Sequence, residues 1–171
     1  MKKAYFAGGC FWCMAPIFRI QKGVLGVESG YSGGDEKDPW YEDVKAQKTG
    51  HRESVCVTYE EKQITYDRLL EIYLANVDPF DPEGQFIDKG RSYTLAIYTT
   101  GDDEVRSASE AISRLEQEAG RKSFISIEPF RNFYRAEAEH QDYDLKHPED
   151  FEKEIEESGR KAFRNNHNRK N

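Results

Sequence analysis

The chain of 171 residues can hold one domain with its own hydrophobic core but not two. Hydrophobic residues make up 37 % and aromatic residues 13 % of the sequence, which argues against intrinsic disorder. A formal net charge of −7, with no basic run interleaved with aromatics, disfavours nucleic acids and anionic membranes as partners, so we expect a small monomeric enzyme.

The first predicted elements are a buried strand and a helix that follows it. Residues 3–7 are mostly apolar, two glycines end this run, and a helical pattern continues to about residue 21. Pro16 has no amide donor, so the helix is expected to begin near residues 12–13 or to kink at Pro16. In either case Cys10 lies at or just before the N-terminal end of this helix.

The same segment has a superficial likeness to a secretory signal peptide, since two lysines precede an apolar stretch at 4–18. This stretch contains two glycines, Trp12 and Pro16, and no small-x-small cleavage site follows it. It is also too short to span a bilayer. We therefore expect it to be part of the core, and the protein to be cytoplasmic.

Strand and helix patterns alternate along the rest of the chain. Strands are predicted at 24–31, 53–59, 93–99 and 124–128, and helices at 65–77, 102–119, 137–145 and 148–157. A turn at 32–35 opens a long polar loop that ends at His51, and a loop rich in Pro and Gly is predicted at 78–91.

This order predicts an α/β fold of the α+β kind, because several connections are long enough for parallel pairing. We expect a single-domain, two-layer sandwich with a mixed sheet flanked by helices. Residues 1–157 are predicted to form the catalytic domain, and residues 158–171 a partly disordered basic C-terminal tail.

Two of the three cysteines have a spacing that indicates redox chemistry. Cys10 and Cys13 form a C-x-x-C pair, which is also half of a zinc site. Cys56 stands alone and the four histidines form no paired ligand motif, so no metal is expected. A strand, two glycines and a helix start would direct free amides at the Cys10 sulfur and lower its pKa. The alternative is a small buried hydrophobe.

Phe11 and Trp12 follow Cys10 directly and allow two interpretations. They can pack in the core, or they can form an exposed apolar slot for a small alkyl group beside the nucleophile.

Several segments together carry a family resemblance. The run GGCFWC at 8–13 resembles the signature of the peptide methionine sulfoxide reductase A family. Further matching segments follow in the family's order: GYSGG at 30–34, DPWYEDV at 38–44, TGHRESV at 49–55, DKGRSY at 88–93 and NFYRAEAEHQDY at 132–143. The similarity covers about residues 4–148.

This resemblance implies a reductase specific for the S epimer of methionine sulfoxide, free or in proteins, that repairs oxidised proteins. It implies no metal or organic cofactor, and an external reductant such as thioredoxin or another thiol. The matching positions are Cys10 as the catalytic cysteine, Phe11 and Trp12 as the methyl pocket, Glu53 as the acid that protonates the sulfoxide oxygen, Tyr41 and Tyr93 as hydroxyls that hold this oxygen, and Asp88 as a supporting polar residue.

The implied chemistry is physically consistent. A sulfoxide sulfur is a poor electrophile until its oxygen is protonated or strongly hydrogen-bonded. Burial among aromatics would raise the pKa of Glu53 enough to make it that acid. Tyrosine hydroxyls would stabilise the developing charge on oxygen, and the step would leave a sulfenic acid on Cys10.

Each of these residues also has a purely structural interpretation. Glu53 can be a solvated strand residue, Tyr41 and Tyr93 can pack with their hydroxyls at the surface, and Asp88 can serve a turn. His140, within the last matching segment, is interpreted as a loop histidine with satisfied hydrogen bonds.

The chain departs from the family pattern at two places. Ala15 stands where many members carry a glutamate, and the C-terminal tail lacks the resolving cysteines that many members have. Cys13 is the nearest candidate to resolve the sulfenic acid. Cys56 is a second candidate, although its side chain should point to the sheet face opposite Glu53. Otherwise an external thiol reduces Cys10 directly.

Two other functions are compatible with parts of the sequence. A thioredoxin-like disulfide oxidoreductase also places C-x-x-C after a strand, but would not need Glu53 or the tyrosines. A non-catalytic module could capture methionine-bearing peptides in the aromatic slot.

Overall fold

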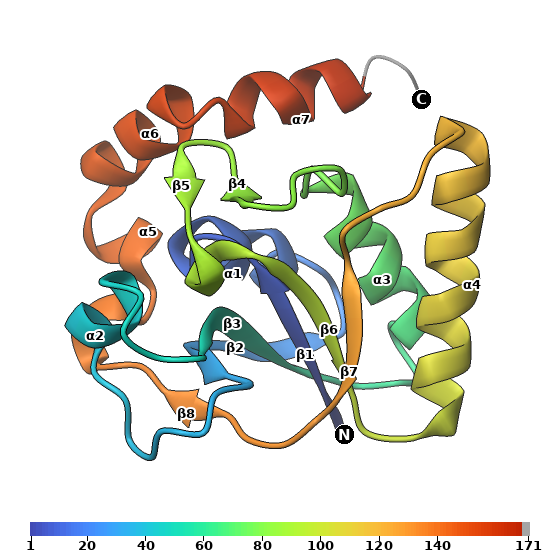
Figure 1. Cartoon of the computed structure of the whole chain (residues 1–171), viewed down its shortest axis with the longest axis horizontal. Helices are drawn as coiled ribbons and strands as arrows, with labels where there is room; N and C mark the ends of the chain where they lie inside the picture. Colours follow the sequence, from blue (N-terminus) through green and yellow to red (C-terminus); the bar gives the residue numbers. More distant parts are fainter. Residues whose placement is uncertain (169–171) are drawn as a thin grey trace.

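The computed structural model describes residues 1–168, and side chains for residues 1–166, around one mixed sheet (Figure 1). The strands lie in the order β7-β6-β1-β3-β2-β8, and only β6 and β7 pair in parallel. Their bounds are β1 (Lys2–Gly8), β2 (Val24–Ser32), β3 (Arg52–Tyr59), β6 (Leu95–Thr99), β7 (Ser126–Pro129) and β8 (Tyr134–Arg135). A separate two-stranded hairpin consists of β4 (Gly84–Gln85) and β5 (Asp88–Lys89).

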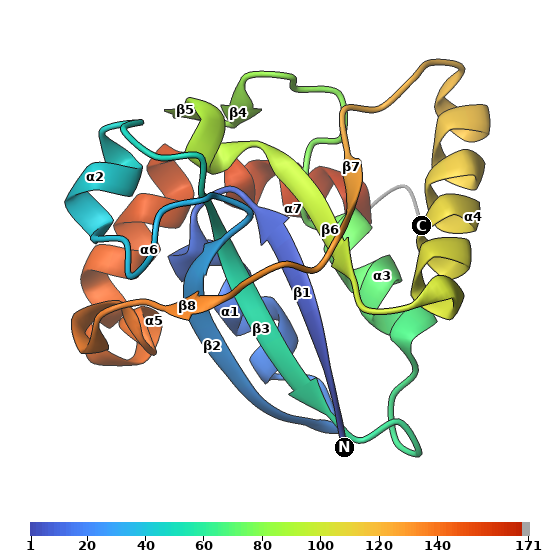
Figure 2. The same ribbon diagram turned by 60° about the horizontal axis from the view of Figure 1, so that its bottom comes forward.

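Helices cover one face of this sheet. The helical segments are α1 (Phe11–Arg19), α2 (Tyr41–Lys45), α3 (Tyr66–Ala75), α4 (Asp102–Ala119), α5 (Tyr143–Lys146), α6 (Pro148–Glu157), α7 (Arg160–Asn168) and the 3-10 turns η1 (Arg91–Tyr93) and η2 (Ala138–His140). Phe6 of β1 packs against Phe18 of α1 and Tyr73 of α3 in the main core. In Figure 2, α3 and α4 lie at the side of the sheet that carries β6 and β7.

An extended segment covers the opposite face. Phe130 stacks on Tyr5 of β1 with ring centroids 4.2 Å apart, and Tyr98 of β6 is buried beside them. The predicted α+β two-layer sandwich with a mixed sheet is therefore confirmed.

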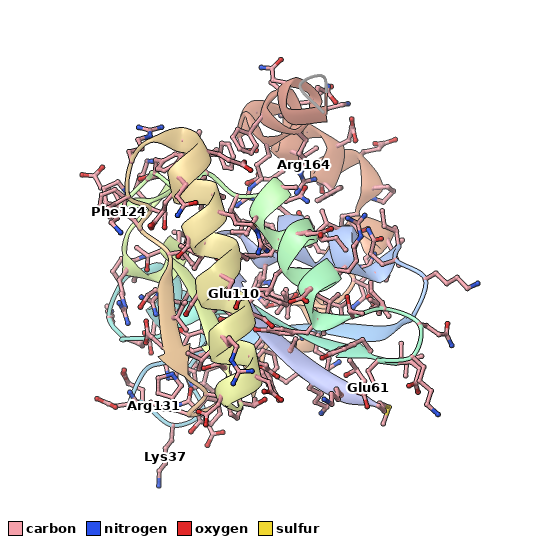
Figure 3. The ribbon with its side chains drawn as sticks, turned by 90° about the vertical axis from the view of Figure 1, so that its right-hand side faces the viewer. Lys37, Glu61, Glu110, Phe124, Arg131 and Arg164 are labelled. Atoms are coloured by element: carbon pink, nitrogen blue, oxygen red, sulfur yellow. The ribbon has the colours of Figure 1, made fainter. Side chains whose placement is uncertain are left out.

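The sequence explains where several helices begin and end. The Thr65 hydroxyl caps α3 by accepting the Arg68 amide at 3.1 Å. Helix α4 begins with three acidic residues, which suit the positive end of the helix dipole, and ends at Gly120 with φ of 71°. Glu110 points to solvent from the outer side of α4 (Figure 3).

Three local predictions differ from the structure. Helix α1 begins at Phe11, because the Cys10 carbonyl accepts the amides of Cys13 and Met14 and so closes a first turn ahead of Pro16. Tyr93 lies in η1 rather than in a strand, and β6 begins at Leu95. The two predicted loops contain α2 and the β4–β5 hairpin, which are too short to produce a periodic pattern.

The C-terminal segment is also more ordered than predicted over the residues that the structure describes. The tail at 158–171 was predicted to be partly disordered, but its residues 160–168 form α7, in which Arg160 is fully buried and donates to main-chain carbonyls of the core. Residues 169–171 lie outside the described part of the chain. Within residues 1–168, each helix is too short or too polar to cross a membrane.

Candidate active site

Cys10 is the residue on which the site is built. It is the N-cap of α1, and its carbonyl accepts the amides of Cys13 at 3.1 Å and Met14 at 3.2 Å. The turn that leads into it requires glycine at position 9, where φ is 86° and a Cβ would lie 2.6 Å from Arg160 Nη2. The prediction that Cys10 lies at the helix start is therefore confirmed, and its side chain is 6 % exposed.

Cys10 and Cys13 form a hydrogen-bonded pair with opposite pKa shifts. The pKa of Cys10 is raised well above its ordinary value by the hydrogen bond with Cys13, then by burial, and further by the charges of Cys13 and Glu53. The pKa of Cys13 is lowered by the hydrogen bond from Cys10, against the effect of burial, and the charges of Arg160 and Arg164 lower it further.

The sequence had led us to expect a lowered pKa at Cys10, and this expectation is wrong for the free, reduced protein. The Phe11 amide, one of those expected to face the sulfur, donates to Glu53 Oε1 at 3.1 Å instead. The charge of Glu53 raises the pKa of Cys10 and the two arginines lower the pKa of Cys13, while the charge of Asp88 raises the pKa of both thiols. Of the two thiols, Cys13 is therefore the one that ionises more readily, and Cys10 holds its proton more firmly.

Glu53 is a buried acid next to this pair. It projects from β3, is 2 % exposed, and has no cation within ion-pair distance among the described residues. Burial raises its pKa to about 8, although the hydrogen bond from the Phe11 amide opposes the shift and the charge of Asp88 adds to it. Near neutral pH Glu53 is therefore mostly protonated and can act as a proton donor.

Aromatic rings form an apolar wall beside Cys10. Phe11 is 1 % exposed and lies 5.8 Å from the Tyr31 ring, whereas Trp12 is half-buried and stacks on Tyr143 at 4.0 Å. Tyr41 packs against both Phe11 and Trp12, with centroids 6.3 Å from each. Phe11 is thus mainly a core residue, and Trp12 and Tyr41 present ring surface to the outside.

Tyr41 and Tyr93 come from distant segments, α2 and η1. Burial raises the pKa of each phenol, and the nearby charges of Glu53 and Cys10 raise both further. Neither hydroxyl has a hydrogen-bond partner within residues 1–166. Two neutral O–H donors are thus available beside the acid and the thiol pair.

Asp88 lies at the start of β5 and is half-buried. Burial raises its pKa, and the charges of Arg160 and Lys45 act in the opposite direction. Its charge in turn raises the pKa of Glu53 and of Cys10. The structure therefore brings all the predicted site residues into one electrostatic neighbourhood.

Sequence reasoning missed the part of His140 in this neighbourhood. Its ring is 6 % exposed and lies 4.1 Å from the Tyr41 ring, and its Nδ1 accepts the Trp12 indole N–H at 3.2 Å. Burial lowers its pKa, so the neutral imidazole can accept this bond. The family resemblance of residues 132–143 was the signal that could have pointed to His140. In the structure, the side-chain amide of Gln141 fixes this segment to Ser29 of β2.

Glu137 is a second residue that sequence reasoning missed. Its carboxylate accepts the Tyr31 hydroxyl at 2.9 Å and the Tyr41 amide at 3.1 Å, and so holds the start of α2. Glu137, Glu139 and His140 bring ligand atoms within 4.8 Å of one another. Glu137 is already engaged in these hydrogen bonds, and the cluster does not indicate a bound metal.

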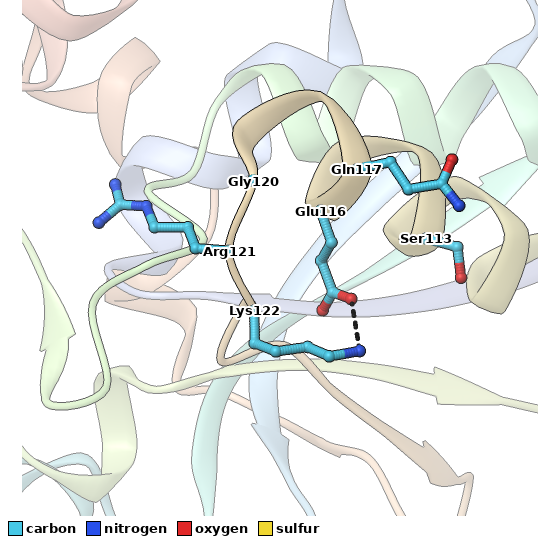
Figure 4. A pocket seen from close by; sticks show the side chains of 6 residues that line it. All are labelled: Ser113, Glu116, Gln117, Gly120, Arg121 and Lys122. Carbon is cyan, nitrogen blue, oxygen red and sulfur yellow. Dashed lines mark hydrogen bonds and ion pairs between the residues drawn. The ribbon is translucent and has the colours of Figure 1, made fainter.

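Residues outside this neighbourhood lack its features. Cys56 is buried and pairs in register with Tyr5, on the face covered by Phe130. Ala15 is buried inside α1 and supplies no acid. A surface hollow at the end of α4 contains none of the predicted site residues and is lined in part by the Glu116–Lys122 ion pair beside Gly120 (Figure 4).

Comparisons with known proteins agree with this geometry. The family model described as peptide methionine sulfoxide reductase matches residues 2–171. The peptide methionine sulfoxide reductase MsrA of Bacillus licheniformis is 43% identical over 166 residues, which is 96% of this chain and 92% of that protein. The MsrA of Halalkalibacterium halodurans is 41% identical over 165 residues, 95% of this chain and 94% of that protein. The crystal structure of reduced Mxr1 from Saccharomyces cerevisiae superposes with a TM-score of 0.82 at 29% identity and covers 86% of each chain.

Proposed function

Because the chain belongs to the peptide methionine sulfoxide reductase family, we propose that Cys10 is the nucleophile of its reaction. The protein is an oxidoreductase that reduces methionine sulfoxide with thiols and so repairs oxidised proteins. A thioredoxin-like disulfide oxidoreductase is not favoured, since the relatives match over nearly the whole chain.

The proposed substrate position follows from the site geometry. The methyl group of the S epimer packs against Trp12 and Phe11, and the sulfoxide oxygen faces Glu53 and the hydroxyls of Tyr41 and Tyr93. Asp88 supports the site by helping to keep Glu53 protonated. No metal or organic cofactor takes part in this proposal.

The first step transfers oxygen from substrate to enzyme. As the Cys10 sulfur attacks the sulfoxide sulfur, its own proton passes to the Cys13 thiolate, and Glu53 protonates the sulfoxide oxygen. The attack forms a bond between the two sulfurs. The hydroxyl group then transfers from the substrate sulfur to the Cys10 sulfur, so that the substrate S–O bond and the S–S bond both break and Cys10 is left as a sulfenic acid. The substrate sulfur gains two electrons, and methionine leaves.

The raised pKa of the buried Glu53 carboxyl group is the observation that carries this proposal. A carboxyl group with a pKa of about 8, buried beside a cysteine at a helix start, is a proton donor at neutral pH. The test is to incubate the protein with methionine S- and R-sulfoxide and dithiothreitol, and to measure methionine formed from each. We expect product from the S epimer alone. Equal rates with both epimers would contradict the proposed oxygen position.

For recycling we propose that Cys13 resolves the sulfenic acid. Cys13 is one helical turn from Cys10 and already hydrogen-bonded to it, whereas Cys56 lies on the opposite sheet face. A thioredoxin-like dithiol then reduces the disulfide. After one equivalent of sulfoxide, digestion and mass mapping should give a Cys10–Cys13 link. A Cys10–Cys56 peptide would reassign the role.

The Cys13→Ser variant separates the two halves of this cycle. It should still release one methionine per chain, and then accumulate a sulfenic acid that dimedone labels. Dimedone-labelled wild type without any disulfide would instead make Cys10 a single-cysteine catalyst served by an external thiol. A monomeric state and residence in the cytoplasm stay predictions from the sequence.

A further inference from the structure

Two arginines of α7 lie against the start of α1. Arg160 is fully buried, and its guanidinium donates to the carbonyls of Gly8 at 2.7 Å and Asn76 at 3.3 Å. Arg164, labelled in Figure 3, donates from Nη2 to the Cys13 carbonyl at 3.1 Å. Both cations therefore reach the helical turn that carries the C-x-x-C pair.

Neither guanidinium has a carboxylate partner within residues 1–166. Their contacts are main-chain carbonyls, the Met14 sulfur and, for Arg160, the face of the Phe86 ring. The Nε atoms of both arginines are buried without a hydrogen-bond partner among these residues. Burial, followed by the charge of Arg160, lowers the pKa of Arg164 to about 10. A buried and a half-buried cation without a hydrogen-bonded carboxylate are costly, so a further negative group beside them is favoured.

Cys13 is the group that can supply this anion. It is 1 % exposed, its carbonyl is held by Arg164, and the charges of both arginines act on its thiol. The other titratable groups that interact with it are Cys10, whose thiol donates a hydrogen bond, Asp88, whose charge opposes ionisation, and Glu53, whose own pKa is raised by the charge of Cys13.

We propose that Arg160 and Arg164 are positioning residues for Cys13, and that they hold it as the thiolate that resolves the Cys10 sulfenic acid and later leaves the disulfide. This inference rests on the proposed recycling through Cys13. It assigns the C-terminal helix to the redox cycle, in a chain whose C-terminal segment contains no cysteine.

The resolving step balances without a further oxidant. The Cys13 sulfur attacks the Cys10 sulfur, an S–S bond forms and the S–O bond of the sulfenic acid breaks. The oxygen leaves as hydroxide and becomes water with the proton that Cys13 gives up. The arginines favour this step because they stabilise the sulfur in its deprotonated, nucleophilic form.

The same charges select which sulfur the external dithiol attacks. Its thiolate forms a mixed disulfide with Cys10, which is the more exposed residue of the pair, and Cys13 leaves as a thiolate. A leaving thiol of lower pKa departs faster, so the arginines direct attack to Cys10. The second thiol of the dithiol then attacks the first one within the mixed disulfide. The dithiol is oxidised to a disulfide, and Cys10 is released in its reduced form.

The test uses the full chain with Arg164→Met, because this half-buried residue is easier to replace than the fully buried Arg160. Arg164→Lys keeps the charge and serves as the rescue variant. Lys161→Gln removes a charge from the exposed side of the same helix and is the matched control. After one equivalent of methionine sulfoxide, methionine release and loss of dimedone labelling are followed by rapid quench.

Arg164→Met should slow loss of dimedone labelling about tenfold relative to Lys161→Gln, and Arg164→Lys should restore most of the rate. In a Cys10→Ser, Cys56→Ser background, ultraviolet titration of the remaining thiolate should show a higher pKa for Cys13 when Arg164 is replaced by Met. A purely structural role would not move this titration.

The outcomes separate the inference from the proposed function. A wild type that forms no Cys10–Cys13 bond contradicts the proposed recycling, and the role of the arginines with it. A wild type that forms the bond, with Arg164→Met equal to Lys161→Gln in both rate and thiolate titration, overturns only the inference.

Discussion

Arg52 and Glu53 are neighbours on β3, and their environments are opposite. Arg52 is 4 % exposed and has three hydrogen-bond partners: its guanidinium donates to Glu128 at 2.7 Å, to the Tyr98 hydroxyl at 3.0 Å and to Thr94 at 2.8 Å. Glu53 is 2 % exposed, and one main-chain amide is its hydrogen-bond donor within the described residues.

The difference follows from the alternation of side chains along a strand. Arg52 points to the face covered by the segment around Phe130, where Glu128 of β7 can reach it, and Glu53 points to the start of α1. A buried charge with an opposite charge beside it is a structural element. A buried acid without a cation keeps its proton, and the site can use that proton.

The largest effect is expected from removing the sulfur that Glu53 faces. Cys10→Ser should reduce turnover to below a few per cent of wild type, because a hydroxyl is a far weaker nucleophile near neutral pH. Cys56→Ser, on the Arg52 side of the sheet, is the control and should keep its activity. Methionine release with dithiothreitol measures both, and substantial activity in Cys10→Ser would contradict the mechanism.

Glu53→Gln should slow sulfoxide reduction in single turnover by roughly 10²–10⁴, since glutamine keeps the shape but cannot transfer a proton. Substrate binding should change little. An unchanged rate would show that the proton comes from a tyrosine or from water.

Arg52→Met should lower the stability of the fold and leave the reaction rate largely unchanged, which is the reverse of the effect expected for Glu53→Gln. The loss of its ion pair and hydrogen bonds should lower the free energy of unfolding by about 3 kcal/mol, the low end for a buried pair because Glu128 is 31% exposed. Turnover per folded molecule should stay near that of wild type. Urea denaturation and single-turnover assays measure the two quantities, and a large loss of activity in folded Arg52→Met would remove the contrast between the two residues.

The last prediction concerns the pH dependence of stability. Glu53 has a pKa of about 8 in the folded protein and an ordinary value of 4.5, so between these values the folded state binds more protons than the unfolded state. The free energy of unfolding of wild type should therefore fall, relative to Glu53→Gln, by about 1 kcal/mol per pH unit as the pH rises from 4.5 to 8, and level off above 8. Parallel curves for the two proteins would mean that Glu53 titrates normally.

Local patterns in the sequence were enough to predict much of the molecule. The bounds of α4, the strands β1, β2 and β3, and the start of α3 at Thr65 follow from periodicity and capping, which act over a few residues. The position of Cys10 at a helix start follows in the same way. The roles of Glu53, Tyr41 and Tyr93 were reached only through the family resemblance, because nothing near them in the chain distinguishes them from ordinary strand and loop residues.

The tertiary structure decided how charge is distributed around the C-x-x-C pair. The burial of Glu53, the contact between His140 and Trp12, and the insertion of Arg160 and Arg164 beside Cys13 join residues more than forty positions apart. A pKa depends on burial and on charges within a few ångströms, whichever part of the chain supplies them. For this reason the sequence alone predicted Cys10 as the nucleophile, and only the folded chain shows that the lowered pKa of the pair belongs to Cys13.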